Sequence, residues 1–312
     1  MRRAHPPARG AVLLLALMLT ALVAALVSTA LWRQSGQIWI ESAERERQQA
    51  QWLLTGATDW ARLILREDAR VAGSSDHLSE PWAVPLQESR ISTFLSSQPN
   101  LSEYTADSPL NDQVWLSGAI IDAQGKFNLT NLFSNNKPDA AALSQLQRLF
   151  ELLGLSSDLT KLLMQNLALT RDPSPSLLPP RTIDDLAAWG FGPEAIERLR
   201  PHLVILPEPS PVNVNTASPE VLAATVPGLS LGQAQRVAQN RLRSPMTDVK
   251  MASSVFGSNW NAATHSIGSQ FFEISGRFRM STVTLAQTAL VKRDKGNVNY
   301  LWVLPSTMTP LP

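Results

Sequence analysis

The chain contains a run of 22 residues without a charged side chain, from Ala11 to Trp32. The ten residues before it carry three arginines and no acidic residue. An apolar helix of about 20 residues, rising about 1.5 Å per residue, is long enough to cross a bilayer. Because basic flanks stay on the cytoplasmic side, we expect a single membrane crossing with the N-terminus in the cytoplasm and the rest of the chain displayed across the membrane.

The junction between the basic leader and the apolar run is open to three interpretations. Gly10 at this boundary resembles the processing site of type IV prepilins, where the prepilin peptidase cuts before the apolar stretch and leaves it on the mature protein. The predicted scissile bond is Gly10–Ala11, and Ala11 would become the N-methylated first residue. The alternatives are an ordinary signal peptide cleaved after residues 28–30, and an uncleaved membrane anchor.

The composition excludes several classes of site. The formal net charge of +1 gives no strong bias towards nucleic acid or anionic lipid beyond the leader. The absence of cysteine excludes disulfides, thiolate metal sites and cysteine nucleophiles. The four histidines lack the spacing of a helical zinc site, and no segment matches an EF-hand calcium loop. No metal ligand is therefore assigned, and Asp122 with Gly125 and Asn128 is interpreted as a hairpin turn.

Helical periodicity continues beyond the apolar run. Residues 37–68 contain no proline, and apolar residues from Ala50 to Ile64 recur at helical spacing. The sequence predicts one helix from about Ala11 to about Asp68, roughly 85 Å long. Its first half is apolar all round and its second half is amphipathic, as expected for a stalk whose distal half packs on a globular head.

Alternation of apolar and polar residues predicts strands on both sides of the middle of the chain. Residues 114–122 are predicted to form a strand that turns back after residue 125. Near the C-terminus, residues 272–280 alternate strictly, and residues 282–292 and 299–304 follow as two further strands. The pattern predicts an antiparallel meander with one buried face. A short helix is predicted around Leu86 to Ser96.

Between these strands, from about residue 139 to residue 264, apolar residues recur at helical spacing. Thr182 and Ser218 are plausible N-caps of short helices in this part. The fold class is therefore α+β, with a long N-terminal transmembrane and amphipathic helix, an antiparallel sheet and an inserted all-α domain. The predicted boundaries are 1–10 for the leader, 11–68 for the helix, 69–135 for the first part of the head, 136–266 for the insert and 267–312 for the C-terminal strands.

Residues 228–232, Gly-Leu-Ser-Leu-Gly, match the G-x-S-x-G motif of a hydrolase nucleophile. That motif needs a strand leading into the serine, whereas the residues before it are predicted to be helical and to end at Pro227. Ser230 would also need a positioned histidine, and His265 is the only one that follows it in the chain. The sequence favours a glycine-containing link between two helices, and predicts that the chain is not an enzyme.

Residues 213–218 followed by residues 226–229 resemble a helix–hairpin–helix unit. In DNA-binding members a second glycine stands two residues after the first, so that backbone N–H groups can face a phosphate. Here that position is Ser230, and we therefore expect the hairpin to act as a scaffold. A membrane-anchored DNA-binding or competence-type protein is the alternative. The arginines that could contact a phosphate backbone are Arg236, Arg241 and Arg243.

Three stretches together resemble the K-type minor pseudopilin family of the type II secretion system. They are the junction Arg9 to Leu15, the segment Ile120 to Leu132 before the insert, and Val212 to Ala217 in the helical region. The resemblance implies a pilin-like head and a non-enzymatic inner-membrane protein whose C-terminal domain is periplasmic. It also implies that the protein starts and caps the pseudopilus, which helps to export folded proteins.

The same resemblance implies a set of partners. They are the I and J minor pseudopilins, the major pseudopilin, the prepilin peptidase and the inner-membrane assembly platform, without nucleic acid. No cofactor is required by any motif of the sequence. Related K-type proteins are understood to bind calcium in the head, and no residue here is matched to that role.

Leu15 stands where most pilins carry a glutamate, and K-type pseudopilins resemble one another in lacking it. That carboxylate is thought to pair with the amino terminus of the neighbouring subunit, and an unpaired one in an apolar core would cost on the order of several kcal/mol. A tip subunit has no subunit above it, so an apolar residue suits it. The positions predicted to pack in the membrane and later in the filament core are Leu13, Leu14, Leu15 and Leu17.

Overall fold

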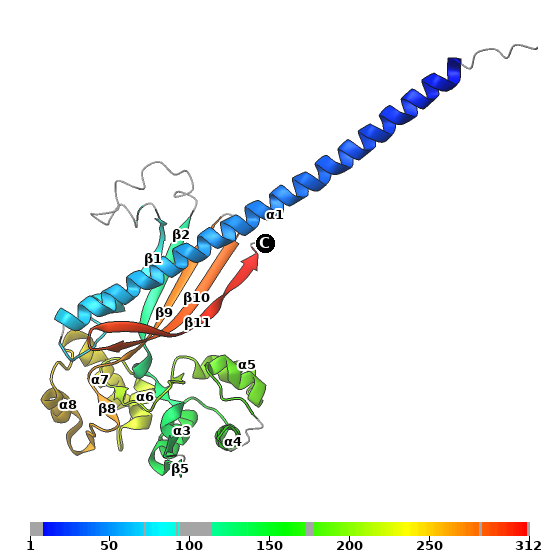
Figure 1. The fold of residues 1–312 in the computed structure, drawn as a ribbon. Helices are drawn as coiled ribbons and strands as arrows, with labels where there is room; N and C mark the ends of the chain where they lie inside the picture. The colour runs from blue at the N-terminus through cyan, green and yellow to red at the C-terminus, as the bar shows by residue number, and fades with distance from the viewer. Residues whose placement is uncertain are drawn as a thin grey trace, which may run out of the picture. The chain divides into compact units, whose positions relative to one another are not determined.

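The computed structural model describes residues 9–71, 73–91, 93, 114–135, 137–171, 177–280 and 283–310. Residues 1–8 of the predicted leader and residues 92 and 94–96 of the predicted short helix lie outside this part of the chain. The structure divides into two units, Met1–Leu53 and Leu54–Pro312. Helix α1, Arg9–Val71, includes the described residues of the first unit and opens the second (Figure 1). The predicted long helix is confirmed.

A five-stranded antiparallel sheet forms the head in the second unit, in the order β1-β2-β9-β10-β11 (Figure 1). β2 and β9 are neighbours although residues 123–270 separate them in the chain, and Asp122 stands opposite Phe272 at the end of the pair. The insert therefore leaves and re-enters the sheet at one point and interrupts no strand pairing. The strands are β1 (Leu86–Arg90), β2 (Trp115–Asp122), β9 (Phe271–Arg279), β10 (Val283–Asp294) and β11 (Asn297–Pro310).

The part of α1 after Leu54 packs on one face of this sheet. Leu65 is fully buried in a cluster with Trp82, Phe272 and Val291. The rings of Trp82 and Phe272 meet edge to face, with centroids 5.3 Å apart. The strict alternation in β9 explains this arrangement, because every second side chain points to the same face of a strand. The guanidinium of Arg62 donates to the carbonyl oxygen of Val298, which ties the helix to β11.

The insert has a hydrophobic core of its own, built mainly from helices. Thr182 and Ser218 are N-cap residues as predicted, and the Ser218 hydroxyl accepts from the N–H of Val221. The α-helices are α3 (Ala140–Leu152), α4 (Ser157–Leu169), α5 (Pro193–Leu199), α6 (Pro219–Thr225), α7 (Leu231–Arg243) and α8 (Val249–Phe256). The 3-10 helices of the second unit are η1 (Pro81–Ala83), η4 (Ala123–Gly125), η5 (Leu129–Leu132), η6 (Ile183–Trp189) and η7 (Gly257–Asn259).

The described part of the insert also contains short strands. Their pairing shows that the predicted return of the chain along β2 is wrong. β3 pairs in parallel with β6, so the chain after Asp122 does not return along β2 as a hairpin. It enters the insert through η4 instead. These strands are β3 (Phe127–Asn128), β4 (Phe133–Ser134), β5 (Lys137–Pro138), β6 (Leu203–Val204), β7 (Val212–Asn213) and β8 (His265–Ser266).

The helix predicted around Leu86 to Ser96 is wrong over its first five residues. These form β1, with Leu86 opposite Gly118 and Arg90 opposite Trp115 of β2. The ladder of hydrogen bonds to β2 outweighs the local helical preference, because an edge strand gains pairing that a short isolated helix lacks.

Candidate functional site

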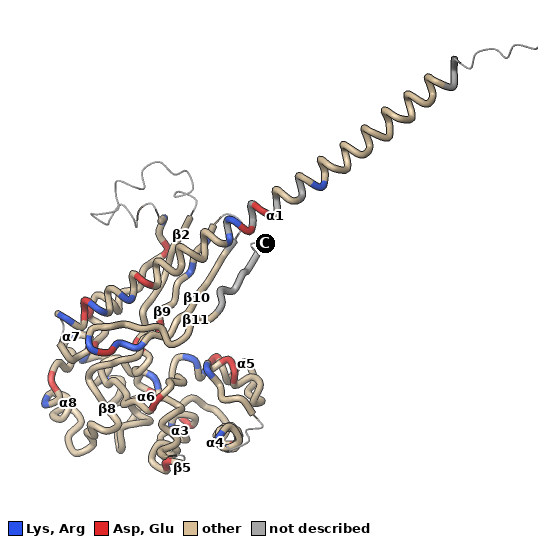
Figure 2. The backbone as a smooth tube through the Cα atoms, viewed as in Figure 1, with Lys and Arg blue, Asp and Glu red and all other residues tan. Residues whose placement is uncertain are grey.

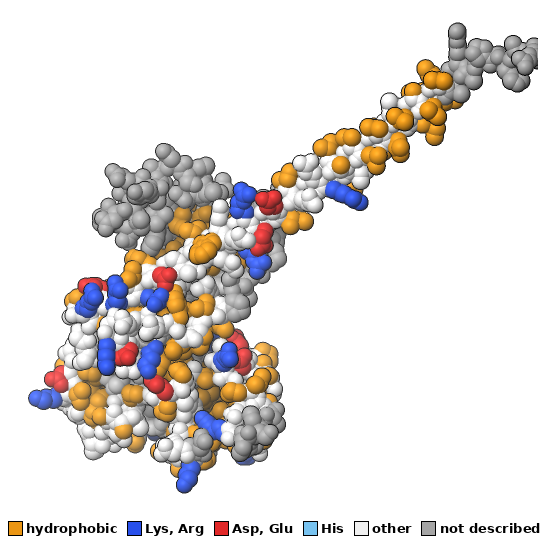
Figure 3. Space-filling view, viewed as in Figure 1, with side chains coloured by type: hydrophobic (Ala, Val, Ile, Leu, Met, Phe, Trp, Pro, Cys, Tyr) orange, Lys and Arg blue, Asp and Glu red, His pale blue; other side chains and the backbone are white. Residues whose placement is uncertain are grey.

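The predicted processing and packing positions all lie in α1. Gly10 and Ala11 are in the first turn of this helix as it stands in the unprocessed chain. Val12–Gln34 is long and apolar enough to cross a membrane, and no acidic or basic residue stands between Arg9 and Arg33 (Figure 2). Apolar side chains cover this part of the helix (Figure 3). The predicted packing residues Leu13, Leu14, Leu15 and Leu17 are 58–68% exposed in the single chain.

In the second unit, a buried carboxylate at the end of β2 joins the insert to the sheet. Asp122 Oδ2 accepts hydrogen bonds from Asn213 Nδ2 at 2.8 Å, Thr216 Oγ1 at 2.6 Å and Ser269 Oγ at 2.6 Å. Its Oδ1 accepts from the N–H of Gln124 at 2.8 Å. Asn213 and Thr216 belong to the helical insert, and Ser269 lies just before β9. The carboxylate therefore holds together the two places where the chain leaves and re-enters the sheet.

The segment 212–217, Val-Asn-Val-Asn-Thr-Ala, supplies buried valines and hydrogen-bonding asparagines to this joint. Its two valines are buried in the core of the insert. Asn213 Nδ2 also lies 3.0 Å from the carbonyl oxygen of Asp76, in the loop after α1. The amide of Asn215 donates to the carbonyl oxygen of Met246 and accepts from its N–H. One asparagine thus faces the head and the other fixes the loop after α7.

The two segments approach so closely that glycine is required at one position. A Cβ atom at Gly125 would lie 2.8 Å from Thr216 Oγ1 and 3.2 Å from the carbonyl carbon of Thr216. Real Cβ atoms do not approach neighbours at the shorter distance. Asn128 has a similar joining role, because its side chain donates to the carbonyl oxygen of Glu208 and accepts from the N–H of Leu206. The residues interpreted as a hairpin turn are therefore the anchor of the insert.

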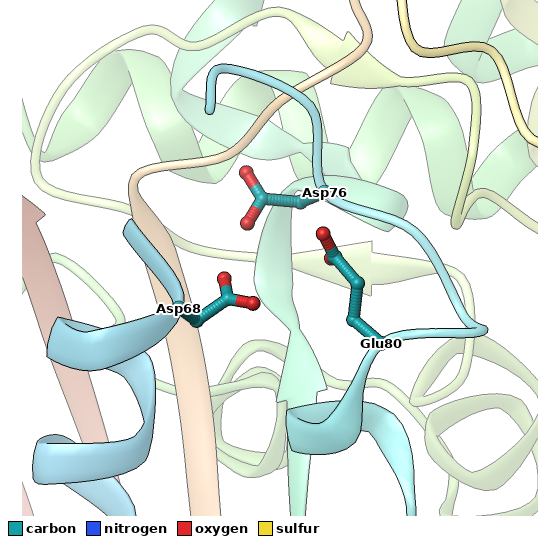
Figure 4. A group of neighbouring side chains, drawn as sticks. All are labelled: Asp68, Asp76 and Glu80. Atoms are coloured by element: carbon teal, nitrogen blue, oxygen red, sulfur yellow. The ribbon is translucent and has the colours of Figure 1, made fainter. Parts of the chain in front are cut away.

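Three carboxylates gather beside this joint. Asp68 comes from the last turns of α1, Asp76 from the following loop and Glu80 from the residue before η1, and their carboxylates converge (Figure 4). One oxygen of each lies within 4.8 Å of the others. Arg293 of β10 balances part of this charge, with Nη1 at 3.0 Å from Asp68 Oδ2 and Nη2 at 2.5 Å from Asp76 Oδ1.

The cluster carries more negative charge than Arg293 can balance. Burial, together with the charges of Glu80 and Asp76, raises the pKa of Asp68 to about 6, although Arg293 opposes this shift. Glu80 Oε2 accepts from the N–H of His77 and from the indole N–H of Trp82. Among the described residues, the buried Oε1 of Glu80 has no hydrogen-bond partner, although it lies 3.8 Å from Nε2 of His77. A buried carboxylate oxygen without a hydrogen bond is costly, so the cluster suits a cation.

Calcium fits the chemistry of these ligands. It prefers carboxylate and carbonyl oxygens, and the cluster offers three carboxylates, one of them with an oxygen that accepts no hydrogen bond. The residues that could hold it are Asp68, Asp76 and Glu80, with Arg293 competing for the two aspartates. Sequence analysis missed this group. The three acidic residues within the segment 68–80 were a usable signal, but the position of Arg293 beside them depends on the fold.

Ser230, considered above as a nucleophile, is the N-cap of α7. Its hydroxyl donates to Gln233 Oε1 at 2.8 Å and accepts from the N–H of Gln233 at 3.3 Å. The segment that leads into it is α6 and a turn, as the sequence predicted. His265 is buried, and its Nδ1 lies 3.0 Å from the hydroxyl of Thr264. The hydroxyl of Ser230 therefore serves to cap a helix.

Helices α6 and α7 pack together as a hairpin, but one of its three arginines is not available to a phosphate. Arg241 is only 6% exposed, and its guanidinium donates to the carbonyl oxygens of Val214 and Ala217. Burial lowers the pKa of Arg241 to about 10. The prediction that Arg241 could contact a phosphate backbone is therefore wrong, and the side chain acts as an internal support. Arg236 and Arg243 are exposed.

Comparisons with known proteins agree on one family. Two family models, both described as type II secretion system protein K, match residues 125–208 and 212–265. The type II secretion system protein K of Pseudomonas aeruginosa is 26% identical over 316 residues, covering 92% of this chain and 89% of that relative. A chain of the GspK-GspI-GspJ complex crystal structure from enterotoxigenic Escherichia coli has the same fold, with a TM-score of 0.59 and 17% identity over 84% of this chain and 98% of that chain.

The buried carboxylate of Asp122 gives a testable pH dependence. Burial raises its pKa to about 6 from an ordinary 3.8, despite the hydrogen bonds that it accepts. The folded state then holds a proton that the unfolded chain releases between these values, so this contribution to stability is complete below about pH 4 and is lost as the pH rises through about 6. We expect Asp122→Asn to show a smaller fall in the free energy of unfolding between pH 4 and pH 7, measured by urea denaturation.

The matched control is Glu194→Gln, since the Glu194 side chain is 80% exposed on α5. It should keep the pH dependence of the parent chain. An Asp122→Asn chain with the same pH slope as the parent would contradict the assignment of this proton to Asp122.

Proposed function

The chain belongs to the type II secretion system protein K family, and we propose that it is the subunit that starts and caps the tip of the periplasmic pseudopilus. In this role it supports the export of folded proteins. The apolar part of α1 is stored in the inner membrane, with the N-terminus in the cytoplasm and the second unit in the periplasm.

The observation that carries the proposal is the helical insert. Residues 123–270 leave the sheet beside Asp122 and return beside Phe272, with a hydrophobic core of their own. In a filament of pilin-like subunits each head is surrounded by copies of itself, and a domain of this size repeated at every position would collide with its neighbours. A subunit used once, at the end of the filament, avoids that conflict.

The N-terminal half of α1 also supports a position at the tip of the pseudopilus. Leu15 is apolar where a carboxylate would need a partner from the next subunit, and a tip subunit has no subunit above it. The exposed leucines from Leu13 to Leu17 are suited first to lipid and then to the core of a helical filament.

The partners follow from this role. A related complex contains chains named GspK, GspI and GspJ, and we propose that the I- and J-type minor pseudopilins also bind this chain. The major pseudopilin lies below them, and the prepilin peptidase and the inner-membrane assembly platform act before assembly. The role is structural and requires no catalysis, in keeping with the capping hydrogen bonds of Ser230.

The position at the tip can be tested by labelling. The chain has no cysteine, so Ser254→Cys on the exposed side of α8 gives a single site for maleimide-gold. In electron micrographs of pseudopili purified from cells that express this variant, we expect one label at one end of each filament. A cysteine placed in the major pseudopilin is the positive control, which should label the whole length. Gold from Ser254→Cys repeated along the filaments would contradict the tip role.

Processing at Gly10–Ala11 can be tested by mass. We expect the protein extracted from membranes of cells with a prepilin peptidase to begin at Ala11 and to carry one additional methyl group, because the peptidase cuts before the apolar run. The control is the same chain from cells without the peptidase, which should keep residues 1–10. A mature chain beginning near Leu31 would identify an ordinary signal peptide, and an intact Met1 in both strains an uncleaved anchor.

Calcium is proposed as the ion of the acidic cluster. The support is the convergence of Asp68, Asp76 and Glu80 and the buried oxygen of Glu80 that accepts no hydrogen bond. A bound divalent cation would neutralise the negative charge of the carboxylates that Arg293 does not balance. Because Asp68 lies in the last turns of α1 and Asp76 and Glu80 lie between α1 and η1, the ion would stabilise the junction of the helix with the head.

We expect calcium at about 100 times its dissociation constant to raise the melting temperature of the EGTA-treated full chain by about 5 °C. In Glu80→Gln the shift should be largely lost, because the amide removes a charged ligand. Glu67→Gln is the control, since the Glu67 side chain is 64% exposed next to the cluster on α1. No calcium shift in the parent chain would contradict the proposal that the cluster binds calcium.

A further inference from the structure

The loop after α1 contacts the segment through which the insert returns to β9. The N–H of Asp76 donates to the carbonyl oxygen of Ile267 at 2.9 Å, and Asp76 Oδ2 accepts from the N–H of Ser269 at 2.7 Å. Between these two contacts, a Cβ atom at Gly268 would lie 2.2 Å from the carbonyl oxygen of Ser74, so only glycine allows the backbones to approach this closely. The loop that carries Asp76 into the acidic cluster is therefore in direct contact with the return segment of the insert.

Two residues bridge Asp76 of the acidic cluster to Asp122 of the joint. Ser269 donates its N–H to Asp76 Oδ2 and its hydroxyl to Asp122 Oδ2, the latter at 2.6 Å. Asn213 Nδ2 lies 3.0 Å from the carbonyl oxygen of Asp76 and 2.8 Å from Asp122 Oδ2. All four of these residues are buried. A displacement of Asp76 would therefore strain or break both bridges to the carboxylate that holds the insert on the sheet.

The charges of the cluster act on Asp76. Asp68, Asp76 and Glu80 each place one oxygen within 4.8 Å of the others, and like charges at this separation repel one another. Arg293 pairs with both aspartates, and Nε2 of His77 lies 3.8 Å from Glu80 Oε1. That oxygen of Glu80 is buried, and among the described residues it accepts no hydrogen bond. A divalent cation bound there would replace the repulsion by a shared attraction and hold Asp76 in place.

We propose that a divalent cation in the acidic cluster controls how firmly the insert is held on the sheet, through Asp76, Ser269 and Asn213. A ligand shifts an equilibrium only as far as its affinity differs between the two states. Here the cation binds the arrangement in which the carboxylates converge, and in that arrangement Asp76 also holds both bridges to Asp122. The proposal rests on the calcium site proposed above, and it adds a consequence of binding at that site: when the cation leaves, the joint opens more often.

The test is hydrogen–deuterium exchange of the full chain in detergent, measured by mass spectrometry in EGTA and in calcium at about 100 times its dissociation constant. The reporting amides are Gln124, which donates to Asp122 Oδ1, and Gln270, which donates to Gln124 Oε1 at 2.6 Å. Neither residue belongs to the cluster. A cation that binds only the closed joint lowers its opening by the same factor, so we expect calcium to slow exchange at these amides by about 100-fold. Peptides of α3, inside the core of the insert, are the internal reference and should change by less than about twofold.

Variants of the bridging residues test the route. We expect Asn213→Ala to keep the rise in melting temperature with calcium, but to lose about tenfold of the slowing at Gln124, because a bridge to a charged acceptor is gone. Ser269→Ala removes the other bridging hydroxyl and should act in the same direction, which keeps the test valid if Asn213→Ala does not fold. The matched control is Thr216→Val. Thr216 also donates to Asp122 Oδ2 at 2.6 Å, but within the described chain it makes no hydrogen bond to Asp76, so the full slowing should remain.

Three results would overturn the inference in distinguishable ways. If calcium raises the melting temperature but slows exchange only in peptides of residues 68–80, the cation stabilises the cluster alone, and the proposed calcium site still stands. If calcium changes neither the melting temperature nor the exchange of the parent chain, the proposed site fails and the inference fails with it. If Thr216→Val loses as much of the slowing as the bridging variants, or if the bridging variants lose none, the effect does not pass through Ser269 and Asn213.

Discussion

A charge inside a folded protein is tolerated only where its oxygens are paired, and the carboxylate of Asp122 meets this condition with groups from separate segments. Asn213 and Thr216 reach it from the helical insert, and Ser269 reaches it from the residues before β9. A rotation of the insert away from the sheet would leave the carboxylate unpaired. The orientation of the insert is therefore set by an electrostatic requirement as well as by apolar packing.

The same network extends to the end of α1. Asn213 lies within hydrogen-bond distance of the Asp76 carbonyl oxygen, and the Asp76 carboxylate pairs with Arg293 of β10. Arg293 also binds Asp68 in the last turns of α1. Helix end, sheet and insert are thus joined by a continuous chain of buried polar groups. A cation bound among the carboxylates would act on this junction directly, because Asp76 belongs both to the cluster and to the network around Asp122.

Most of the architecture could be predicted from the sequence, because helix α1 and strands β9 and β10 repeat their patterns over many residues. Where a strand or a side chain binds a partner far along the chain, the local sequence pattern was not enough to predict the structure. Leu86–Arg90 became an edge strand through pairing with β2. Asp122 was assigned to a local turn, although Asn213 and Ser269 bind it from far along the chain. The acidic cluster was missed for the same reason, since the position of Arg293 is a consequence of the strand order.

The insert lies beside the outer face of the sheet, which is the face opposite the packed part of α1. With the insert held beside β2 and β9, that face becomes one wall of a trough whose other wall carries Arg181 and Arg200. The joint at Asp122 fixes how the insert is placed beside the sheet, because its hydrogen bonds join Asn213 and Thr216 of the insert to the end of β2.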